Sequence, residues 1–165
     1  MDLKRKVKRL INKNMVGMFV TQGEGKLYSR PIAYAEVDSE NNVWFFTDIN
    51  SNKIANITSN NQVNFSFANH TVNEYVSLTG TAEIITDPET IDEKWQFYMK
   101  AWWPEGKDGD RLTLIKVAPE LVEYWDGSSS KAVQAYDVVK ALVTGRSYVD
   151  VANSKNELIS YEYEN

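Results

Sequence analysis

Cysteine is absent from this chain of 165 residues, and histidine occurs only once. Without cysteine there is no disulfide framework, no thiol nucleophile and no thiolate ligand for zinc or an iron–sulfur cluster. A single imidazole also excludes any site that requires two histidines. That residue, His70, lies in a turn-like sequence, where a histidine is more often solvated than catalytic. We therefore expect no metal site, and the sequence leaves the catalytic residues unknown.

Long apolar runs are also missing. None approaches the roughly 20 residues that a membrane-spanning helix needs. The basic N-terminal segment is not followed by the apolar core of a secretory signal. We therefore expect no membrane partner and, by default, a cytoplasmic location. A chain of this length suits a single domain with a hydrophobic core of its own.

Positive charge is scarce outside the N-terminus. The first thirteen residues hold six cations and one acid, Asp2, which leaves 12 basic against 22 acidic residues in the remainder. An acidic body disfavours a nucleic-acid groove, because such grooves neutralise phosphates with cations. Leu3, Val7, Leu10 and Ile11 share one helical face, with the cations opposite. We interpret the basic run as a solvated helix face, and a nucleic-acid arm is the alternative.

The order of the remaining segments predicts the fold. Apolar runs separated by turn residues predict strands at residues 15–21, 27–37, 43–46, 62–68, 74–85 and 112–125. Helices are expected in the first 13 residues and at 51–57, 88–102 and 132–143. Short turns in up-and-down order favour an antiparallel β-barrel with peripheral helices, an α+β fold. We expect the barrel domain at 1–127 and a C-terminal helix and tail at 128–165, packed on the same domain or partly flexible.

Two residues indicate where the sheet is irregular. Gly80, in the middle of a long strand, predicts a bend of the kind that lets a sheet curl. Pro31 cannot donate a ladder hydrogen bond, so its strand is expected to be bulged or to lie at an edge. Its neighbour Arg30 is thereby placed where the sheet opens.

A strand, a short turn and a helix follow one another between Val43 and Ile57. The first part is apolar and aromatic, Ile54 and Ile57 have helical spacing, and Asn50 or Ser51 is placed to cap the helix. The free N–H groups and positive dipole end of such a helix favour an anion. The sequence therefore predicts an anion site that needs only a cation.

Two cations are available to that site. Between Asn14 and Glu93 the only basic residues are Lys26, Arg30 and Lys53. An arginine that a strand turns inward needs a partner. We therefore predict that Arg30 and Lys53 are aimed at one phosphate. Capped helices with one lysine, and strand arginines on a solvated face, are also common, so these residues alone leave a purely structural role open.

Five short motifs, in their order and spacing, resemble the pyridoxamine 5'-phosphate oxidase-like FMN-binding split β-barrels, most closely the general stress protein 26 branch. The resemblance covers residues 3–127 and rests on Ser29-Arg30-Pro31-Ile32, Trp44-Phe45-Phe46-Thr47-Asp48 with Ser51-Asn52-Lys53, Gly80-Thr81-Ala82-Glu83, Ala101-Trp102-Trp103-Pro104-Glu105-Gly106, and Glu123-Tyr124-Trp125-Asp126-Gly127. It implies an antiparallel split β-barrel and a homodimer with FMN in a cleft between the subunits.

The resemblance also implies roles for single residues. The FMN phosphate would be held by Arg30, Ser51 and Lys53. The isoalloxazine edge would lie along Phe46 and Thr47. Trp125 matches a tryptophan that approaches the flavin, although it could equally close the core with its neighbour Tyr124. The expected FMN-binding set is completed by residues from the same motifs, Ser29, Asp48 and Asn52; Asp48 is also a natural turn former.

Departures from the oxidase itself narrow the expected function. At two positions where the oxidase carries basic residues this chain has Asn52 and Ala35, so about two of four phosphate-directed cations remain and FMN could bind loosely. Gly127 is followed by small residues in place of the arginine- and histidine-bearing segment that grips the oxidase's substrate. We therefore expect a flavin-dependent oxidoreductase of undefined substrate and not a pyridoxine phosphate oxidase. The alternative is a non-catalytic module that binds or senses a flavin, or acts through its dimer surface.

Overall fold

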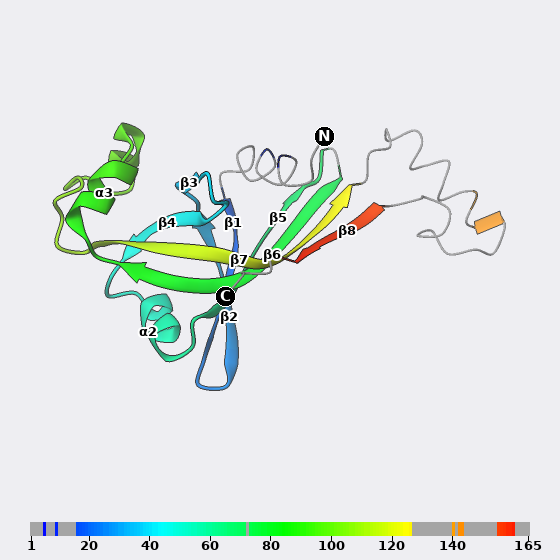
Figure 1. The fold of residues 1–165 in the computed structure, drawn as a ribbon, viewed down its shortest axis with the longest axis horizontal. Coiled ribbons are helices and arrows are strands. Elements are labelled where there is room, and N and C mark those ends of the chain that lie inside the picture. The colour runs from blue at the N-terminus through cyan, green and yellow to red at the C-terminus, as the bar shows by residue number, and fades with distance from the viewer. Residues whose placement is uncertain are drawn as a thin grey trace.

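The computed structural model of the chain describes residues 5, 9, 16–71, 73–125, 140 and 142–143 and the backbone of 126 and 155–160. Figure 1 shows the arrangement of its strands and helices. The strands and helices are β1 Val16–Gly23, β2 Lys26–Ala33, β3 Glu36–Val37, β4 Val43–Asp48, α2 Asn52–Ser59, β5 Gln62–Asn69, β6 Glu74–Ile85, α3 Pro88–Lys94, the 3-10 helix η1 Phe97–Ala101, β7 Leu112–Asp126 and β8 Lys155–Ser160.

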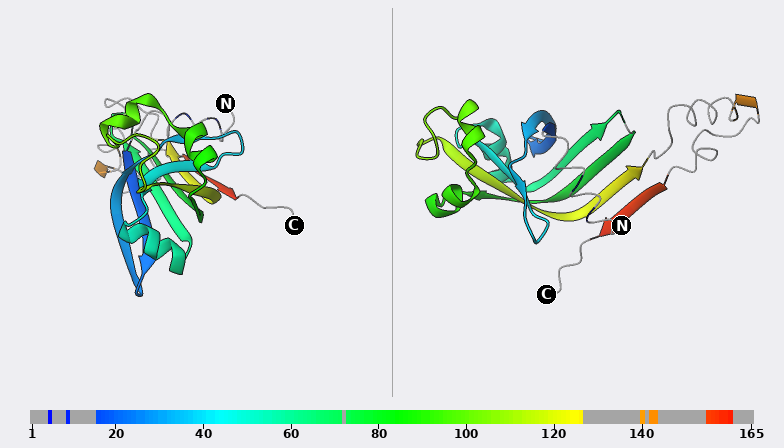
Figure 2. Two further views of the ribbon diagram at one scale, coloured as in Figure 1. Left: turned by 90° about the vertical axis from the view of Figure 1, so that its left-hand side faces the viewer. Right: turned by 90° about the horizontal axis from the view of Figure 1, so that it is seen from above.

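The strands form one antiparallel sheet with the order β2-β1-β5-β6-β7-β4-β3, and β8 pairs with β7. The end strands β2 and β3 are joined by only two residues, so Ala33 and Glu36 lie within about 11 Å of each other. A flat path of seven strands would hold its ends roughly 29 Å apart. The sheet must therefore curl, as both views in Figure 2 show. Among the described strands no ladder joins β2 to β3, so this sheet is open, consistent with a split barrel.

β7 is the longest strand and has two different neighbours along one edge. Its first half pairs with β4, from Val43↔Val117 to Asp48↔Leu112. Its second half pairs with β8, from Leu121↔Ser160 to Asp126↔Lys155. Figure 1 shows β8 beside the end of β7 that lies away from α2 and α3. The two halves of β7 thus belong to different ends of the molecule.

Aromatic residues dominate the interior of the curled sheet. Phe19, Phe45 and Phe65, from three strands, are fully buried. The ring of Phe45 lies 5.3 Å from that of Phe19 and 4.9 Å from that of Phe65, centroid to centroid. Contacts of this kind stabilise beyond the area they bury. A second, smaller core under α3 contains Ile91 and Leu114, so α3 covers the outer face of the sheet.

The bend at Gly80 and the edge position of Pro31 are both confirmed. The β6–β7 register shifts between Thr79 and Gly80, and a Cβ atom at Gly80 would collide with the carbonyl oxygen of Ala118. β2, which carries Pro31, is the end strand of the path. It needs no bulge there, because its register with β1 is regular from Val16↔Ala33 to Gly23↔Lys26.

Two predicted elements differ in extent from the structure, and one strand was not predicted. The expected strand 27–37 is two strands, broken at Tyr34 and Ala35. The expected helix 88–102 is also split, with α3 ending before Trp95, whose ring packs at 5.7 Å against Phe46. Tertiary packing therefore overrides helical continuity at that point. The tail contributes a strand, β8, which the local sequence pattern did not predict.

The start of α3 is as predicted. Asp87 is its N-cap, and the carboxylate accepts from the backbone N–H of Thr90 at 2.9 Å. The following residue, Pro88, occupies the first helical position, where its missing N–H costs nothing. Sequence signals at this helix start are therefore sufficient to place it.

The predicted helices in the first 13 residues and at 132–143 lie mostly outside the described residues. Of these segments Arg5, Arg9, Lys140, Leu142 and Val143 are described, and all are helical. Arg9 is not simply solvated. Its Nη2 lies 3.1 Å from Oε1 of the buried carboxylate Glu74.

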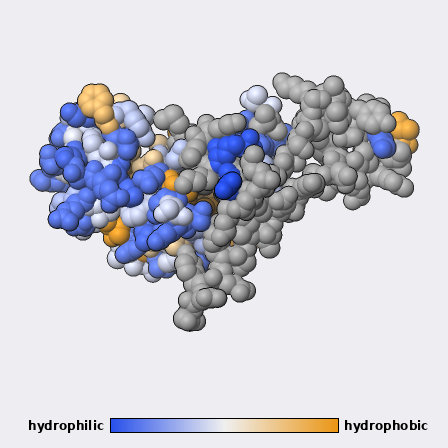
Figure 3. Space-filling model, turned by 45° about the horizontal axis from the view of Figure 1, so that its top comes forward, coloured by the Kyte–Doolittle hydropathy of each residue, from blue (hydrophilic) through white to orange (hydrophobic). Residues whose placement is uncertain are grey.

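The surface of the described part is mostly polar on the face that Figure 3 shows, with apolar residues in separate places. No helix among the described residues is long and apolar enough to cross a membrane. His70 lies in an exposed turn after β5, and its ring is 6.0 Å from that of Tyr75.

Candidate functional site

The turn between β4 and α2 builds the first side of the candidate site. The Asp48 carboxylate accepts from the backbone N–H of Asn50 at 2.8 Å, and its carbonyl accepts from the N–H of Ser51 at 3.0 Å. Asp48 is thus a turn former, and its side chain closes the bend before the helix. The bond from Asn50, followed by the ion pair with Arg111, holds the pKa of the Asp48 carboxyl below its usual value.

Ser51 is the N-cap of α2 by position but not by hydrogen bond. Its side chain makes no capping bond to the helix, although a serine here ordinarily accepts from a free N–H of the first turn. The Ser51 Oγ is buried and has no hydrogen-bond partner. The hydroxyl is therefore available at the helix start for a group that the chain itself does not supply.

Arg30 is the second side of the site. It pairs across the ladder with Phe19, which is fully buried, so its side chain lies on the inner face of the sheet. Its guanidinium carbon lies 5.9 Å from the centre of the Tyr28 ring. Burial lowers the pKa of Arg30, and its Nη1 is buried without a hydrogen-bond partner. An inward arginine thus lacks the partner that its position requires.

Lys53 joins the two sides. Its Nζ donates to Oγ1 of the buried Thr47 at 2.8 Å. Burial, followed by the nearby charge of Arg30, lowers the pKa of Lys53, and Asp48 acts in the opposite direction. The electrostatic effect of Arg30 on Lys53 shows that the two predicted cations are close together.

Buried polar atoms without hydrogen-bond partners are rare in proteins. Two such atoms belong to residues that were predicted to bind the phosphate. Among the residues that the structure describes, only Arg30 Nη1 and Ser51 Oγ are buried side-chain nitrogen or oxygen atoms with no hydrogen bond. Leaving such a group unpaired costs roughly 1–3 kcal/mol, and more for a charged one. Both atoms can donate a hydrogen bond, so an acceptor-rich anion is the group that would satisfy them.

An open pocket of about 510 Å³ is lined by Lys53 and by Pro31, the chain neighbour of Arg30, although Arg30 and Ser51 do not line it themselves. Its lining includes Thr47, Asp48 and Lys53, and also the aromatic residues Phe46, Tyr98 in η1 and Trp102 at the end of η1. Its volume is in the range of small-molecule sites. The pocket lining therefore combines a cation with aromatic side chains.

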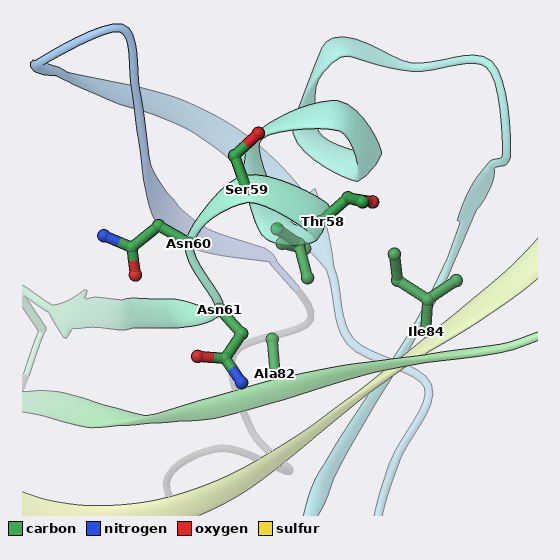
Figure 4. Close-up of a pocket in the computed structure, with 7 residues that line it drawn as sticks. Thr58, Ser59, Asn60, Asn61, Ala82 and Ile84 are labelled. Atoms are coloured by element: carbon green, nitrogen blue, oxygen red, sulfur yellow. The ribbon is translucent and has the colours of Figure 1, made fainter.

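A second pocket, of about 500 Å³, lies at the opposite end of α2. Figure 4 shows Ala82 and Ile84 on β6 beneath the last turn of the helix, with Asn60 and Asn61 at one side. Asn60 donates through Nδ2 to Oε1 of Gln22 at 2.8 Å. Neither Arg30 nor Ser51 lines this second pocket. The first pocket, which Lys53 of the same group lines, is therefore the candidate site.

The structure brings some of the predicted residues together and separates others. Arg30, Thr47, Asp48 and Lys53 gather as described, with Phe46 in the same pocket and Ser51 at the adjacent helix start. Ser29 is exposed and points to the other face of β2, and Asn52 is exposed at the first turn of α2. Neither adds a contact to this group.

Trp125 lies far from this group within one chain. It is in the second half of β7, paired with Tyr75 and Asn156, whereas Thr113 in the first half pairs with Thr47. Twelve residues of strand separate Trp125 from Thr113, roughly 40 Å along the chain. Trp125 and Lys53 of the same chain therefore do not contact one small ligand.

Sequence reasoning missed two features of the site. Arg111, just before β7, forms an ion pair with Asp48, and the only signal for it was its place at a strand start. The η1 wall was quoted as a motif without a role, although two adjacent tryptophans in a polar loop are a signal for a binding surface. Neighbouring Tyr98 helps to raise the pKa of Tyr34, after burial, so η1 lies against the β2–β3 link.

Comparison with known proteins agrees with this fold. The family model described as "Pyridoxamine 5'-phosphate oxidase like" matches residues 2–149, and the chain belongs to that family. It is 28% identical to Protein bli-3 of Neurospora crassa over 144 residues, which is 81% of this chain and 69% of that protein.

Two solved structures share the fold. A protein of Jannaschia sp. CCS1 designated as general stress protein 26 is 23% identical with a TM-score of 0.71, covering 97% of this chain and 99% of that one. A pyridoxamine 5'-phosphate oxidase-related, FMN binding protein of Nostoc punctiforme is 14% identical with a TM-score of 0.59, covering 79% and 87%. The resemblance drawn from the motifs is thereby confirmed at the level of the family.

Proposed function

We propose that the chain binds FMN and holds its phosphate with Arg30, Ser51 and Lys53. The observation that carries the proposal is the pair of buried, unpartnered donors, Arg30 Nη1 and Ser51 Oγ. Family membership and the FMN binding protein of Nostoc punctiforme support the same cofactor. The proposal explains why the chain retains two unsatisfied buried groups next to a pocket.

The chemistry of the three side chains fits a phosphate monoester. A guanidinium and an ammonium give charge-assisted hydrogen bonds to phosphate oxygens, and the hydroxyl donates a third. The start of α2 adds its free N–H groups and positive dipole end. Two cations offset a dianion, so the missing basic residues at Asn52 and Ala35 weaken the site without abolishing it.

The remaining predicted contacts extend this proposal. Backbone groups of Phe46 and Thr47, which line the pocket, would meet the edge of the flavin ring. Trp125 would act from a second copy of the chain, because its own Lys53 is too far away. This is the homodimer that the family resemblance implies, with the cofactor between subunits in a cytoplasmic protein.

The proposed activity is that of a flavin-dependent oxidoreductase whose substrate differs from pyridoxine phosphate. Bound FMN would supply hydride and electron transfer, which is the hard chemistry in such proteins. The chain's own part is to bind the phosphate, orient the ring and exclude water from the pocket. Lys53 and Arg30 hold negative charge, and Thr47 holds Lys53 in place.

Native mass spectrometry of freshly purified protein tests the proposal. We expect a dimer that carries one FMN per subunit and gives a yellow solution. If the protein arrives empty, titration with FMN should restore binding. Consumption of NAD(P)H by the FMN-loaded protein would establish the enzyme, whereas binding without consumption of any reductant favours the non-catalytic flavin module. Failure of added FMN to bind contradicts the proposal.

A further inference from the structure

Exposed aromatic residues line one wall of the candidate pocket. Trp102 is 62% exposed and Tyr98 is 49% exposed, and both line the pocket that Lys53 also lines. Large aromatic side chains usually bury most of their surface. This wall therefore presents apolar ring surface that nothing in the described part of the chain covers.

The η1 segment that carries this wall is anchored from behind. Met99 is buried, and its carbonyl accepts from the N–H groups of Trp102 and Trp103, each at 3.0 Å. Trp103 packs on the smaller core that contains Ile91 and Leu114. The exposed rings of Tyr98 and Trp102 are thus held by a fixed backbone, which is what a binding surface requires.

The lining of the pocket matches one kind of ligand. It includes a cation, Lys53, and aromatic side chains, Tyr98 and Trp102. A molecule with an anionic group and a planar ring, joined by a short chain, satisfies both. Resting on the proposed binding of FMN, we infer that Trp102 and Tyr98 form the surface against which the flavin ring stacks, and that they set the affinity for the ring independently of the phosphate.

Neighbouring Phe97 provides a matched control. It belongs to the same η1 segment and is 82% exposed, but it does not line the pocket. Its ring instead lies 5.6 Å from the Lys100 ammonium. A role of η1 that is merely apolar or structural would make Phe97 and Trp102 equivalent, whereas a stacking role would separate them.

The experiment uses two ligands, FMN and riboflavin, which share the ring and differ in the phosphate. Trp102→Ala should weaken the affinity for both by the same factor, about tenfold, the size of one aromatic stacking contact. Bound flavin should also become more fluorescent, because a stacked tryptophan quenches it. Trp102→Phe should restore most of the affinity, Tyr98→Ala should resemble Trp102→Ala, and Phe97→Ala should leave both affinities unchanged.

Lys53→Ala distinguishes failure of the ring contact from failure of the phosphate site. It should weaken FMN and leave riboflavin unchanged. If the parent binds FMN but Trp102→Ala matches Phe97→Ala in affinity and fluorescence, the stacking inference is wrong and the phosphate site stands. If the parent binds neither flavin, both are wrong. If Trp102→Ala changes only the subunit count in sedimentation, a second copy covers this wall and the stacking inference is wrong.

Discussion

The two ends of α2 differ in whether their polar side chains have hydrogen-bond partners. The end with the unpartnered side chain identifies the site. At the C-terminal end Thr58 and Ser59 donate to the carbonyls of Ile54 and Ala55 at 2.9 and 3.1 Å, and Asn60 is bonded to its neighbours. At the N-terminal end Ser51 has no partner. Because the adjoining pockets have nearly equal volumes of about 500 and 510 Å³, size does not distinguish them. The unpartnered Ser51 Oγ distinguishes the N-terminal end of the helix from the C-terminal end.

The largest effect is expected from Arg30→Met, which removes the cation and keeps an unbranched apolar side chain. FMN affinity should fall by about 2–3 kcal/mol, the loss of a charge-assisted hydrogen bond. The free energy of unfolding without FMN should not fall, because the guanidinium Nη1 has no partner to lose. FMN titration and urea unfolding measure the two quantities.

Ser29→Ala is the control for that substitution, because Ser29 is the adjacent residue on the opposite face of β2. It should change neither quantity. An Arg30→Met protein that binds FMN like the parent would contradict the phosphate site.

Lys53→Met should weaken FMN binding by roughly 1.5–3 kcal/mol, again for a charge-assisted bond. Lys53 should also make the free energy of unfolding and the FMN affinity depend on pH. Because burial lowers the pKa of Lys53 below its usual value of 10.5, between these two values the unfolded chain holds a proton that the folded chain has lost. The free energy of unfolding without FMN therefore rises with pH in that window.

Bound phosphate favours the charged ammonium, so FMN binding takes up a proton in the same window and its affinity falls as pH rises. Titrations of the parent and of Lys53→Met across the alkaline range measure this dependence. In Lys53→Met, the free energy of unfolding and the FMN affinity should both lack the pH dependence that Lys53 contributes. Equal pH dependence in the two proteins would show that Lys53 does not meet the phosphate.

Ser51→Ala and Asp87→Ala compare two helix caps with different tasks. Ser51→Ala should weaken FMN binding by about 1.5 kcal/mol, near the lower limit for a hydrogen bond to a charged group, with little change in stability. Asp87 makes its capping bond at 2.9 Å, so Asp87→Ala should lower the free energy of unfolding and leave FMN binding unchanged. Thermal unfolding and FMN titration of both variants measure these effects. Loss of FMN affinity in Asp87→Ala, or loss of stability without loss of affinity in Ser51→Ala, would contradict this assignment.

The smallest effect on binding is expected at the C-terminal end of α2. Asn60→Ala removes the 2.8 Å bond to Gln22 and should cost about 0.5–1.5 kcal/mol of stability. FMN affinity should be that of the parent. A marked loss of affinity here would mean that the second pocket, not the first, holds the ligand.

Local signals in the sequence predicted the parts of the fold that local physics controls. Asp87 and Pro88 mark the start of α3 because capping involves only adjacent residues. Pro31 predicted an edge strand because a missing N–H excludes the middle of a sheet. Arg30 and Lys53 were predicted to meet because cations are rare in this part of the chain. Their role as FMN ligands stays a prediction.

The features that the sequence did not reveal depend on contacts between distant segments. α3 ends at Trp95 because that ring packs on Phe46, which helical periodicity cannot show. β8 is a strand only because β7 offers it an edge. The exposure of Trp102 beside a pocket is likewise a property of the folded surface. For the same reason the separation of Trp125 from Lys53 required the register of β7.

The preference for FMN over riboflavin tests the phosphate site most directly, because the two ligands differ only in the phosphate. The parent should prefer FMN by about 100-fold or more, given two or three charge-assisted bonds of at least about 1.5 kcal/mol each. In the double variant Arg30→Met, Lys53→Met this preference should shrink to about tenfold, the contribution of Ser51, while riboflavin affinity stays the same. An undiminished preference for FMN in that variant would contradict the account.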